Sequence, residues 1–155
     1  MMIEYCAMWV GHCYVHHKNI MPALKKKYID TGNVLYIYRD FPNTDLGIQT
    51  HMIAHCLGSD DRTRFLEALY GRKLGGPTNQ IHFTAAEQLG FSREKIDSCL
   101  ADRKLRSDVV SLMDGMKRLN LYAFPTFFIN SEMSVGQAPL EFFETKFNEI
   151  LAAGK

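Results

Sequence analysis

The chain has 155 residues, 46% of them hydrophobic, which fits one folded domain with a sizeable core. A formal net charge of +1 gives no bulk electrostatic attraction to nucleic acid or to membranes, and no apolar stretch is long enough to span a bilayer. The first residues carry an early acid and no basic region, so they do not predict a signal peptide.

The first forty residues predict a strand, a helix and a second strand. Residues 1–8 are expected to form a short buried strand, and a helix is expected over 11–30, where apolar residues recur every four positions. Pro22 lies inside that helical pattern and predicts a kink. Residues 34–38 are nearly all apolar or aromatic, which is typical of a strand covered on both faces. The order strand, helix, strand predicts a parallel βαβ unit.

The middle of the chain predicts helices, and the end returns to strands. The expected helices span 45–57, 59 onward, 84–90, 92–100 and 102–119, with a loop at 74–79. Thr84 and Glu87 have capping-box spacing, so the third of these helices is expected to begin at Thr84. Two short strands at 126–129 and 133–135 precede a last helix from Pro139. The whole order is therefore βαβ, a helical block, then ββα.

Cysteines lie at positions 6, 13, 56 and 99, and four cysteines can pair in three ways that the sequence alone does not separate. Cys6, on the first predicted strand, is expected to be a small buried hydrophobic residue. A Cys6–Cys13 disulfide is the less favoured alternative, because a strand end and a helix start would have to meet with strict geometry.

Three pairs of possible metal ligands are spaced four residues apart, so each pair can share a helix face. The pairs are His12 with His16, Cys13 with His17, and His51 with His55. No third and fourth ligand follows at a recognisable spacing. Satisfied or solvated histidines are therefore expected, with no metal and no other cofactor.

Several segments, in their shared order, resemble DsbA-like proteins of the alphaproteobacterial branch of the thioredoxin superfamily. They are Glu4-Tyr5 followed by His12-Cys13 and His17, then 22–32, 39–42, Cys56 before Gly58, 99–102 and 124–130. The resemblance implies one α/β thioredoxin-like domain over 1–155, with its core in 1–43 and 119–155 and a helical insertion at 44–118. The family usually has an additional strand before this point, so we expect the first family strand to be missing and the start to be truncated or misplaced.

The resemblance also implies where the redox chemistry has changed. The family site usually reads Cys-Pro-His-Cys at a helix N-terminus, and here the matching residues are Val10-Gly11-His12-Cys13. Valine has no sulfur and no cysteine adjoins position 10, so the ordinary two-electron dithiol cycle is expected to be lost. His12 matches the family histidine that tunes the thiolate. Cys13 could act as a lone thiol that forms mixed disulfides, although a shielded and largely inert cysteine is the favoured interpretation.

Further roles follow from the same resemblance. Cys56 and Cys99 match a second, structural cysteine pair and are expected to form a disulfide, with two reduced core cysteines as the alternative in a reducing cytosol. Phe124-Pro125 matches the cis-proline loop that faces the dithiol, and with Val10 it would form an apolar patch for an extended client peptide. A trans proline in an ordinary turn is the alternative. Glu4 matches a buried acid beneath the site, or else it is an acid at a fraying terminus.

The resemblance implies a thiol–disulfide interchange protein that forms disulfide bonds in envelope proteins. Val10 is expected to impair it as a dithiol oxidase. Whether the protein is an enzyme is therefore left open. The alternative is a non-catalytic peptide-binding or chaperone-like module that uses Val10, Phe124 and Pro125. A third interpretation is a truncated product with no settled role. The expected partners are unfolded or cysteine-containing polypeptides and a membrane redox partner, with no nucleic acid. The family implies the periplasm, and a correct start would imply the cytoplasm.

Overall fold

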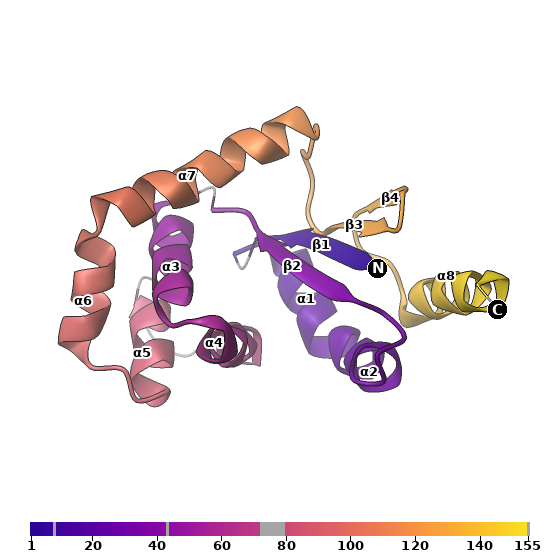
Figure 1. Cartoon of the computed structure of the whole chain (residues 1–155), viewed down its shortest axis with the longest axis horizontal. Coiled ribbons are helices and arrows are strands. Elements are labelled where there is room, and N and C mark those ends of the chain that lie inside the picture. The colour runs from indigo at the N-terminus through magenta and orange to yellow at the C-terminus, as the bar shows by residue number, and fades with distance from the viewer. Residues whose placement is uncertain (8, 43, 72–79, 155) are drawn as a thin grey trace. The chain divides into compact units, whose positions relative to one another are not determined.

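The computed structural model describes residues 1–7, 9–42, 44–71 and 80–154, which fall into two compact units (Figure 1). One unit combines Met1–Asp40 with Leu121–Lys155, and the other is Phe41–Asn120. The loop predicted at 74–79 lies outside the described residues.

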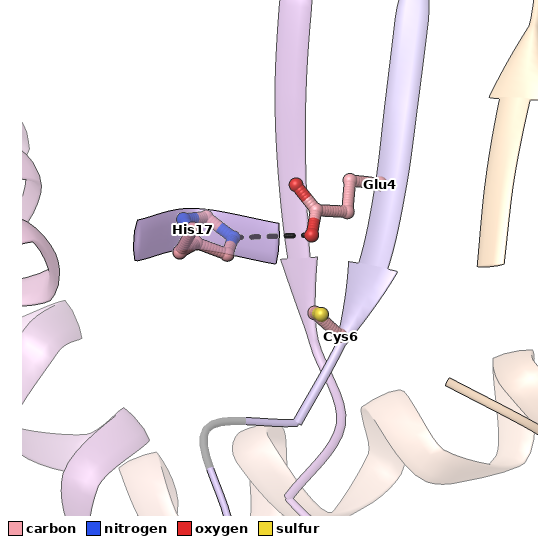
Figure 2. A group of neighbouring side chains, drawn as sticks. All are labelled: Glu4, Cys6 and His17. Atoms are coloured by element: carbon pink, nitrogen blue, oxygen red, sulfur yellow. Dashed lines mark hydrogen bonds and ion pairs between the residues drawn. The ribbon is translucent and has the colours of Figure 1, made fainter. Parts of the chain in front are cut away.

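The first unit contains a four-stranded mixed sheet of order β2-β1-β3-β4. The strands are β1 (Met2–Cys6), β2 (Tyr36–Asp40), β3 (Thr126–Ile129) and β4 (Glu132–Val135). β1 runs parallel to β2 and antiparallel to β3, so Ile3 lies opposite both Ile37 and Phe128. Because side chains alternate along a strand, Met2, Glu4 and Cys6 are buried on one face of β1, two of them drawn in Figure 2. The predicted α/β thioredoxin-like order is confirmed.

The helix predicted over 11–30 is divided into three segments. They are α1 (Gly11–Asn19), α2 (Met21–Leu24) and the π-helical η1 (Lys25–Ile29). Pro22 lies in the first turn of α2, where its missing N–H would have had no helical partner. The predicted kink is therefore a break at Ile20, which separates α1 from α2.

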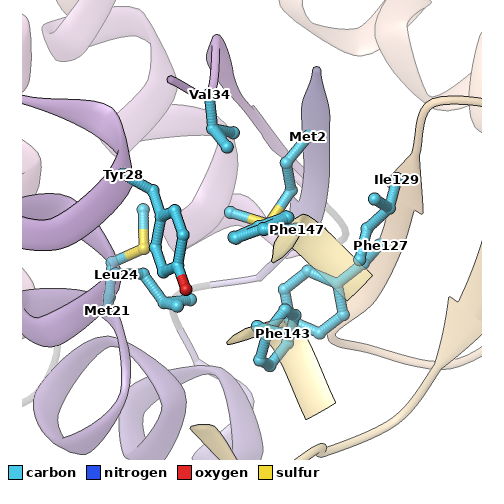
Figure 3. Close-up of a cluster of buried hydrophobic side chains, with 9 residues drawn as sticks. All are labelled: Met2, Met21, Leu24, Tyr28, Val34, Phe127, Ile129, Phe143 and Phe147. Atoms are coloured by element: carbon cyan, nitrogen blue, oxygen red, sulfur yellow. The ribbon is translucent and has the colours of Figure 1, made fainter. Parts of the chain in front are cut away.

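The core of this unit lies between the sheet, the α2–η1 segment and α8 (Leu140–Ala153). Its buried members, drawn in Figure 3, are Met2, Met21, Leu24, Tyr28, Val34, Phe127, Ile129, Phe143 and Phe147. Phe143 is fully buried, and its ring centroid lies 4.9 Å from that of Phe127 in an edge-to-face arrangement. This packing fixes β1, which carries Glu4 and Cys6, and β3, which follows Pro125.

The second strand begins two residues later than predicted. Val34 donates its N–H to the carbonyl of Tyr28, which keeps it in the turn after η1, and Leu35 is 64% exposed. The prediction that the run 34–38 would be covered on both faces is therefore wrong at Leu35.

The second unit is helical. Its helices are α3 (Asp45–Cys56), α4 (Ser59–Gly71), α5 (Ile81–Gln88), α6 (Arg93–Ala101) and α7 (Arg103–Arg118). Ser92 and Asp102 cap α6 and α7 by accepting backbone N–H groups, as their sequence positions predict. The capping box predicted at Thr84 is wrong, because Thr84 lies inside α5 and donates to the carbonyl of Gln80. Among the described residues, no helix combines the length and the apolar character needed to cross a membrane.

Candidate redox site

A disulfide joins the end of β1 to the first turn of α1. Cys6 is the last residue of β1, Cys13 is the third residue of α1, and their Cα atoms lie 5.8 Å apart. Both side chains are fully buried, and the N–H of Ala7 points at the Cys13 sulfur at 3.3 Å. The connection folds back tightly, because Val10 donates its N–H to the carbonyl of Ala7 at 2.9 Å.

This disulfide overturns two expectations. Cys6 is not an unpaired hydrophobic residue, and Cys13 is not a lone thiol. In the sequence no cysteine adjoins Val10, and the disulfide partner of Cys13 is Cys6, at the end of β1. The tight turn through Ala7 and Val10 supplies the strict geometry that the sequence did not reveal.

Val10 occupies the N-cap position of α1, where the helix presents unpaired N–H groups. Its backbone is extended, its side chain makes no capping hydrogen bond, and its carbonyl accepts the first helical N–H, from Tyr14. A thiolate at this position would be stabilised by those N–H groups and by the helix dipole. The Val10 side chain has no group that can accept these N–H groups or carry a charge, so this stabilisation is not used at the N-cap of α1.

The first turn of α1 is connected to the proline loop. His12 is exposed, and its Nδ1 lies 3.0 Å from Oε1 of Gln137. Next to Gln137, Gly136 donates its N–H to the carbonyl of Pro125 at 2.8 Å. The Phe124–Pro125 peptide bond is cis; Pro125 is buried and Phe124 is half-buried. Two of the predicted site elements, the helix start and the proline loop, are therefore linked by a short chain of contacts.

Beneath the disulfide lies a buried acid that contacts residues of α1 and β2. Glu4 is fully buried, so it is not an acid at a fraying terminus. The Nε2 atom of His17 lies 3.0 Å from Oε1 of Glu4, as Figure 2 shows, and the hydroxyl of Tyr36 donates to Oε2 at 2.7 Å. Strand alternation places Glu4 on the face of Cys6, and a spacing of four places His17 on the face of Cys13. The two faces meet, which brings acid, histidine and disulfide together.

These contacts decide the charge of Glu4. Burial alone raises its pKa, but the charge and hydrogen bond of His17, with smaller contributions from His16 and Tyr36, outweigh burial and hold the pKa below its usual value. Burial lowers the pKa of His16 to about 4, against an opposing effect of Glu4. His16 is thus neutral near pH 7, with its ring 4.8 Å from that of Phe127. The cluster holds one ionised carboxylate without contact to solvent.

The second disulfide lies within the helical unit. Cys56, the last residue of α3, is bonded to Cys99 of α6, and their Cα atoms are 6.1 Å apart. This is the pairing that the family resemblance implied. His51 and His55, one of the histidine pairs from the sequence, have ring centroids 6.0 Å apart on α3.

Sequence reasoning missed a group of metal-ligand atoms at the site. One donor atom each from Glu4, Cys6 and His17 lies within 4.8 Å of the others. The spacing rule paired Cys13 with His17 on the helix but ignored the strand. The available signal was the separation of two between Glu4 and Cys6, which puts both on one face of β1.

The βαβ–ββα order, with a helical block between its halves, is the order expected of a thioredoxin-like fold. The family model described as Thioredoxin matches residues 1–145, and this chain belongs to that family. A Rickettsia typhi relative, named “Putative protein-disulfide oxidoreductase”, is 30% identical over 137 residues, which cover 83% of this chain and 50% of the relative. A Rickettsia conorii relative of the same description is 27% identical over 160 residues, or 99% and 57% of the two chains. The chain thus spans about half the length of the curated relatives it matches.

Within this family the chain is DsbA-like. The crystal structure of Wolbachia pipientis alpha-DsbA1 matches with a TM-score of 0.87 and 25% identity, covering 98% of this chain and 85% of that one. The thiol-disulfide exchange protein alpha-DsbA2 of the same organism matches in fold, with a TM-score of 0.75 and 20% identity over 96% of this chain and 80% of that one.

Proposed function

We propose that this protein is a DsbA-type thiol–disulfide interchange protein in which direct exchange with polypeptide clients is impaired. Family membership supports the first half of the proposal. One observation carries the second half: the N-cap of α1 is Val10, and both sulfurs of the remaining pair, Cys6 and Cys13, are fully buried.

The chemistry explains why burial matters. To oxidise a client dithiol, a client thiolate must attack the sulfur of Cys6 or Cys13, and the other sulfur leaves as a thiolate. The second client thiolate then breaks this mixed disulfide, so the client becomes oxidised and the pair becomes reduced. Neither sulfur is exposed, so attack requires local opening of the first turn of α1. An opening free energy of about 3 kcal/mol would lower the reactive fraction about a hundredfold.

The proposal places the protein in the cell envelope, as is usual for the DsbA-like family. Its clients would be unfolded or cysteine-containing polypeptides, and a membrane redox partner would restore the disulfide. Such clients would meet the chain where α1 begins, beside the loop of Phe124 and Pro125, to which His12 is linked through Gln137.

Val10→Cys tests the proposal. The new thiol lies at the helix N-cap, where free N–H groups favour its thiolate, and it lies outside the buried pair. The new thiolate can attack the sulfur of Cys13, from which Cys6 leaves as a thiolate, so the disulfide moves to position 10 and Cys13, where a client thiolate can open it. We expect oxidation of a dithiol peptide to become at least tenfold faster than with the native protein. Val10→Ser is the matched control, because it has the shape of the cysteine variant without the sulfur, and it should exchange as slowly as the native protein. Native protein that turns over as fast as Val10→Cys would contradict the proposal.

A second candidate function is non-catalytic binding of extended peptides. It is favoured by apolar surface in the segment before Pro125 and at the start of α1, because Tyr122 is 80% exposed and Val10 and Phe124 are half-buried. Phe124→Ala should then weaken the binding of an unfolded, cysteine-free peptide, measured by fluorescence anisotropy. Leu35→Ala removes similar exposed apolar surface from the turn before β2 and should leave binding unchanged. Equal binding by Phe124→Ala and the native protein would count against this function.

A further inference from the structure

The donor atoms beneath the disulfide form a cluster that client exchange does not use. One donor each from Glu4, Cys6 and His17 lies within 4.8 Å of the others, and Figure 2 shows the three side chains between β1 and α1. Glu4 and Cys6 are fully buried, and the His17 side chain is 12% exposed. Cys13 adds a second sulfur, because it is bonded to Cys6. Two sulfurs, one imidazole nitrogen and one carboxylate oxygen therefore meet in one buried place.

We propose that reduction of the Cys6–Cys13 disulfide converts this cluster into a binding site for Zn²⁺. The proposal concerns the reduced protein and does not require exchange with a client. Its ligands are the sulfurs of Cys6 and Cys13, Nε2 of His17 and Oε1 of Glu4.

The oxidation state decides whether the site can exist. Cysteine binds a metal ion as a thiolate. In the oxidised protein neither sulfur can be a thiolate, because both are used in the S–S bond. A dithiol or a phosphine supplies two electrons that break this bond, and each sulfur takes up one proton. Zn²⁺ then displaces the two thiol protons into solvent and forms two Zn–S bonds. A bound metal ion and the Cys6–Cys13 disulfide therefore cannot be present at the same time.

Small shifts would bring the donor atoms, which lie within 4.8 Å of one another, to the spacing of a tetrahedral Zn²⁺ site. With Zn–S bonds of about 2.3 Å and Zn–N or Zn–O bonds of about 2.0–2.2 Å, neighbouring donors in a tetrahedron lie roughly 3.3–3.8 Å apart. Nε2 of His17 is already 3.0 Å from Oε1 of Glu4, so inserting the cation between them requires only a small separation. Once the S–S bond is broken, the Cys13 sulfur is free to move away from Cys6 by the amount the tetrahedron needs.

The surroundings support a cation at this place. The Glu4 carboxyl group is buried without contact to solvent, and two thiolates beside it would be unpaired buried charges unless a dication were present. The hydroxyl of Tyr36 holds the second carboxylate oxygen, Oε2, which orients Oε1 toward His17. A set of two sulfurs, one nitrogen and one oxygen favours Zn²⁺ over the hard cations Mg²⁺ and Ca²⁺.

The test uses Co²⁺ as a spectroscopic substitute for Zn²⁺, with the Cys56→Ala/Cys99→Ala protein as the parent. That double variant removes the other pair of thiols that reduction would release. The parent is reduced with a phosphine, desalted without oxygen, and checked for two free thiols by alkylation and mass spectrometry. We expect one equivalent of Co²⁺ to give thiolate charge-transfer absorption and the intense visible bands of tetrahedral Co²⁺, and Zn²⁺ to displace it. The oxidised parent should give neither signal.

A ligand variant distinguishes this site from adventitious binding. His17→Gln in the same parent should bind Zn²⁺ at least tenfold more weakly. Its far-ultraviolet circular dichroism in the oxidised state, where no metal is involved, shows whether the variant folds. Lys18→Gln is the matched control on the next residue of α1 and should bind as the parent does. Far-ultraviolet circular dichroism of the reduced parent shows that it remains folded. A folded reduced parent that gives no tetrahedral Co²⁺ spectrum, equal binding by the oxidised protein, or undiminished binding by a folded His17→Gln variant would overturn the proposal.

Discussion

Replacing both Cys56 and Cys99 with alanine is expected to destabilise the protein by about 4 kcal/mol. The two cysteines are separated by 43 positions, and loop-closure entropy for a loop of about that length gives this magnitude near room temperature. The Cys6–Cys13 bond closes a separation of only 7 and should contribute about 2.4 kcal/mol by the same relation. Alanine is preferred to serine, because Cys99 is 2% exposed and a hydroxyl there would be buried without an assured partner.

Urea denaturation of the oxidised proteins, followed by far-ultraviolet circular dichroism, measures the difference. For a chain of this size, a loss of 4 kcal/mol corresponds to a fall in Tm of about 8–16 °C. Reduction of the native protein should produce a loss at least as large, because it opens both bonds. A double variant that loses less than about 1 kcal/mol would refute the reasoning, as would a larger loss from Cys6→Ala/Cys13→Ala than from the Cys56 and Cys99 pair.

Two further predictions concern the two units separately. Phe143→Ala should reduce the free energy of unfolding by about 3–5 kcal/mol, because the ring is fully buried against Phe127. Phe142→Ala, at the half-buried neighbouring residue, should reduce it less. Equal losses of stability in thermal denaturation would contradict the assignment of the core. Burial, assisted by Arg93, lowers the pKa of His82 from 6.5 to about 4, so the unfolded chain binds a proton first and stability is lost as the pH falls from about 6.5 toward 4. The loss attributable to His82 is about 3 kcal/mol by pH 4, and His82→Leu should therefore give a flatter dependence of unfolding free energy on pH. Parallel curves for the variant and the native protein would be inconsistent with a neutral buried histidine.

The sequence predicted the order of elements because the signals for it are local. Apolar periodicity located the helices, and Ser92 and Asp102 marked two helix starts by side-chain chemistry that needs no tertiary context. The same kind of local reasoning gave a wrong helix start at Thr84. Its spacing to Glu87 fits a capping box, yet α5 begins three residues earlier, after Gln80. The prediction that β2 begins at Val34 was wrong because a hydrogen bond from Val34 to Tyr28 keeps this residue in a turn.

The site was predicted in part, for a different reason. Val10 could be identified by its place before His12 and Cys13, because a motif is a property of neighbouring residues. The pairing of Cys6 with Cys13 depends on how tightly the chain turns between strand and helix, and the turn is set by the hydrogen bond from Val10 to Ala7. The contact of Glu4 with His17 likewise joins two elements whose mutual placement no local pattern specifies.

The most direct test of the central claim is a single-turnover reaction between the oxidised native protein and an equimolar dithiol peptide. The peptide is followed by mass spectrometry after acid quenching, and the protein by alkylation of any thiol released from Cys6 or Cys13. We predict that less than a tenth of an equivalent of peptide is oxidised in the time that Val10→Cys needs to react fully. One equivalent of oxidised peptide, formed as fast as with Val10→Cys and matched by two new thiols at Cys6 and Cys13, would contradict the account.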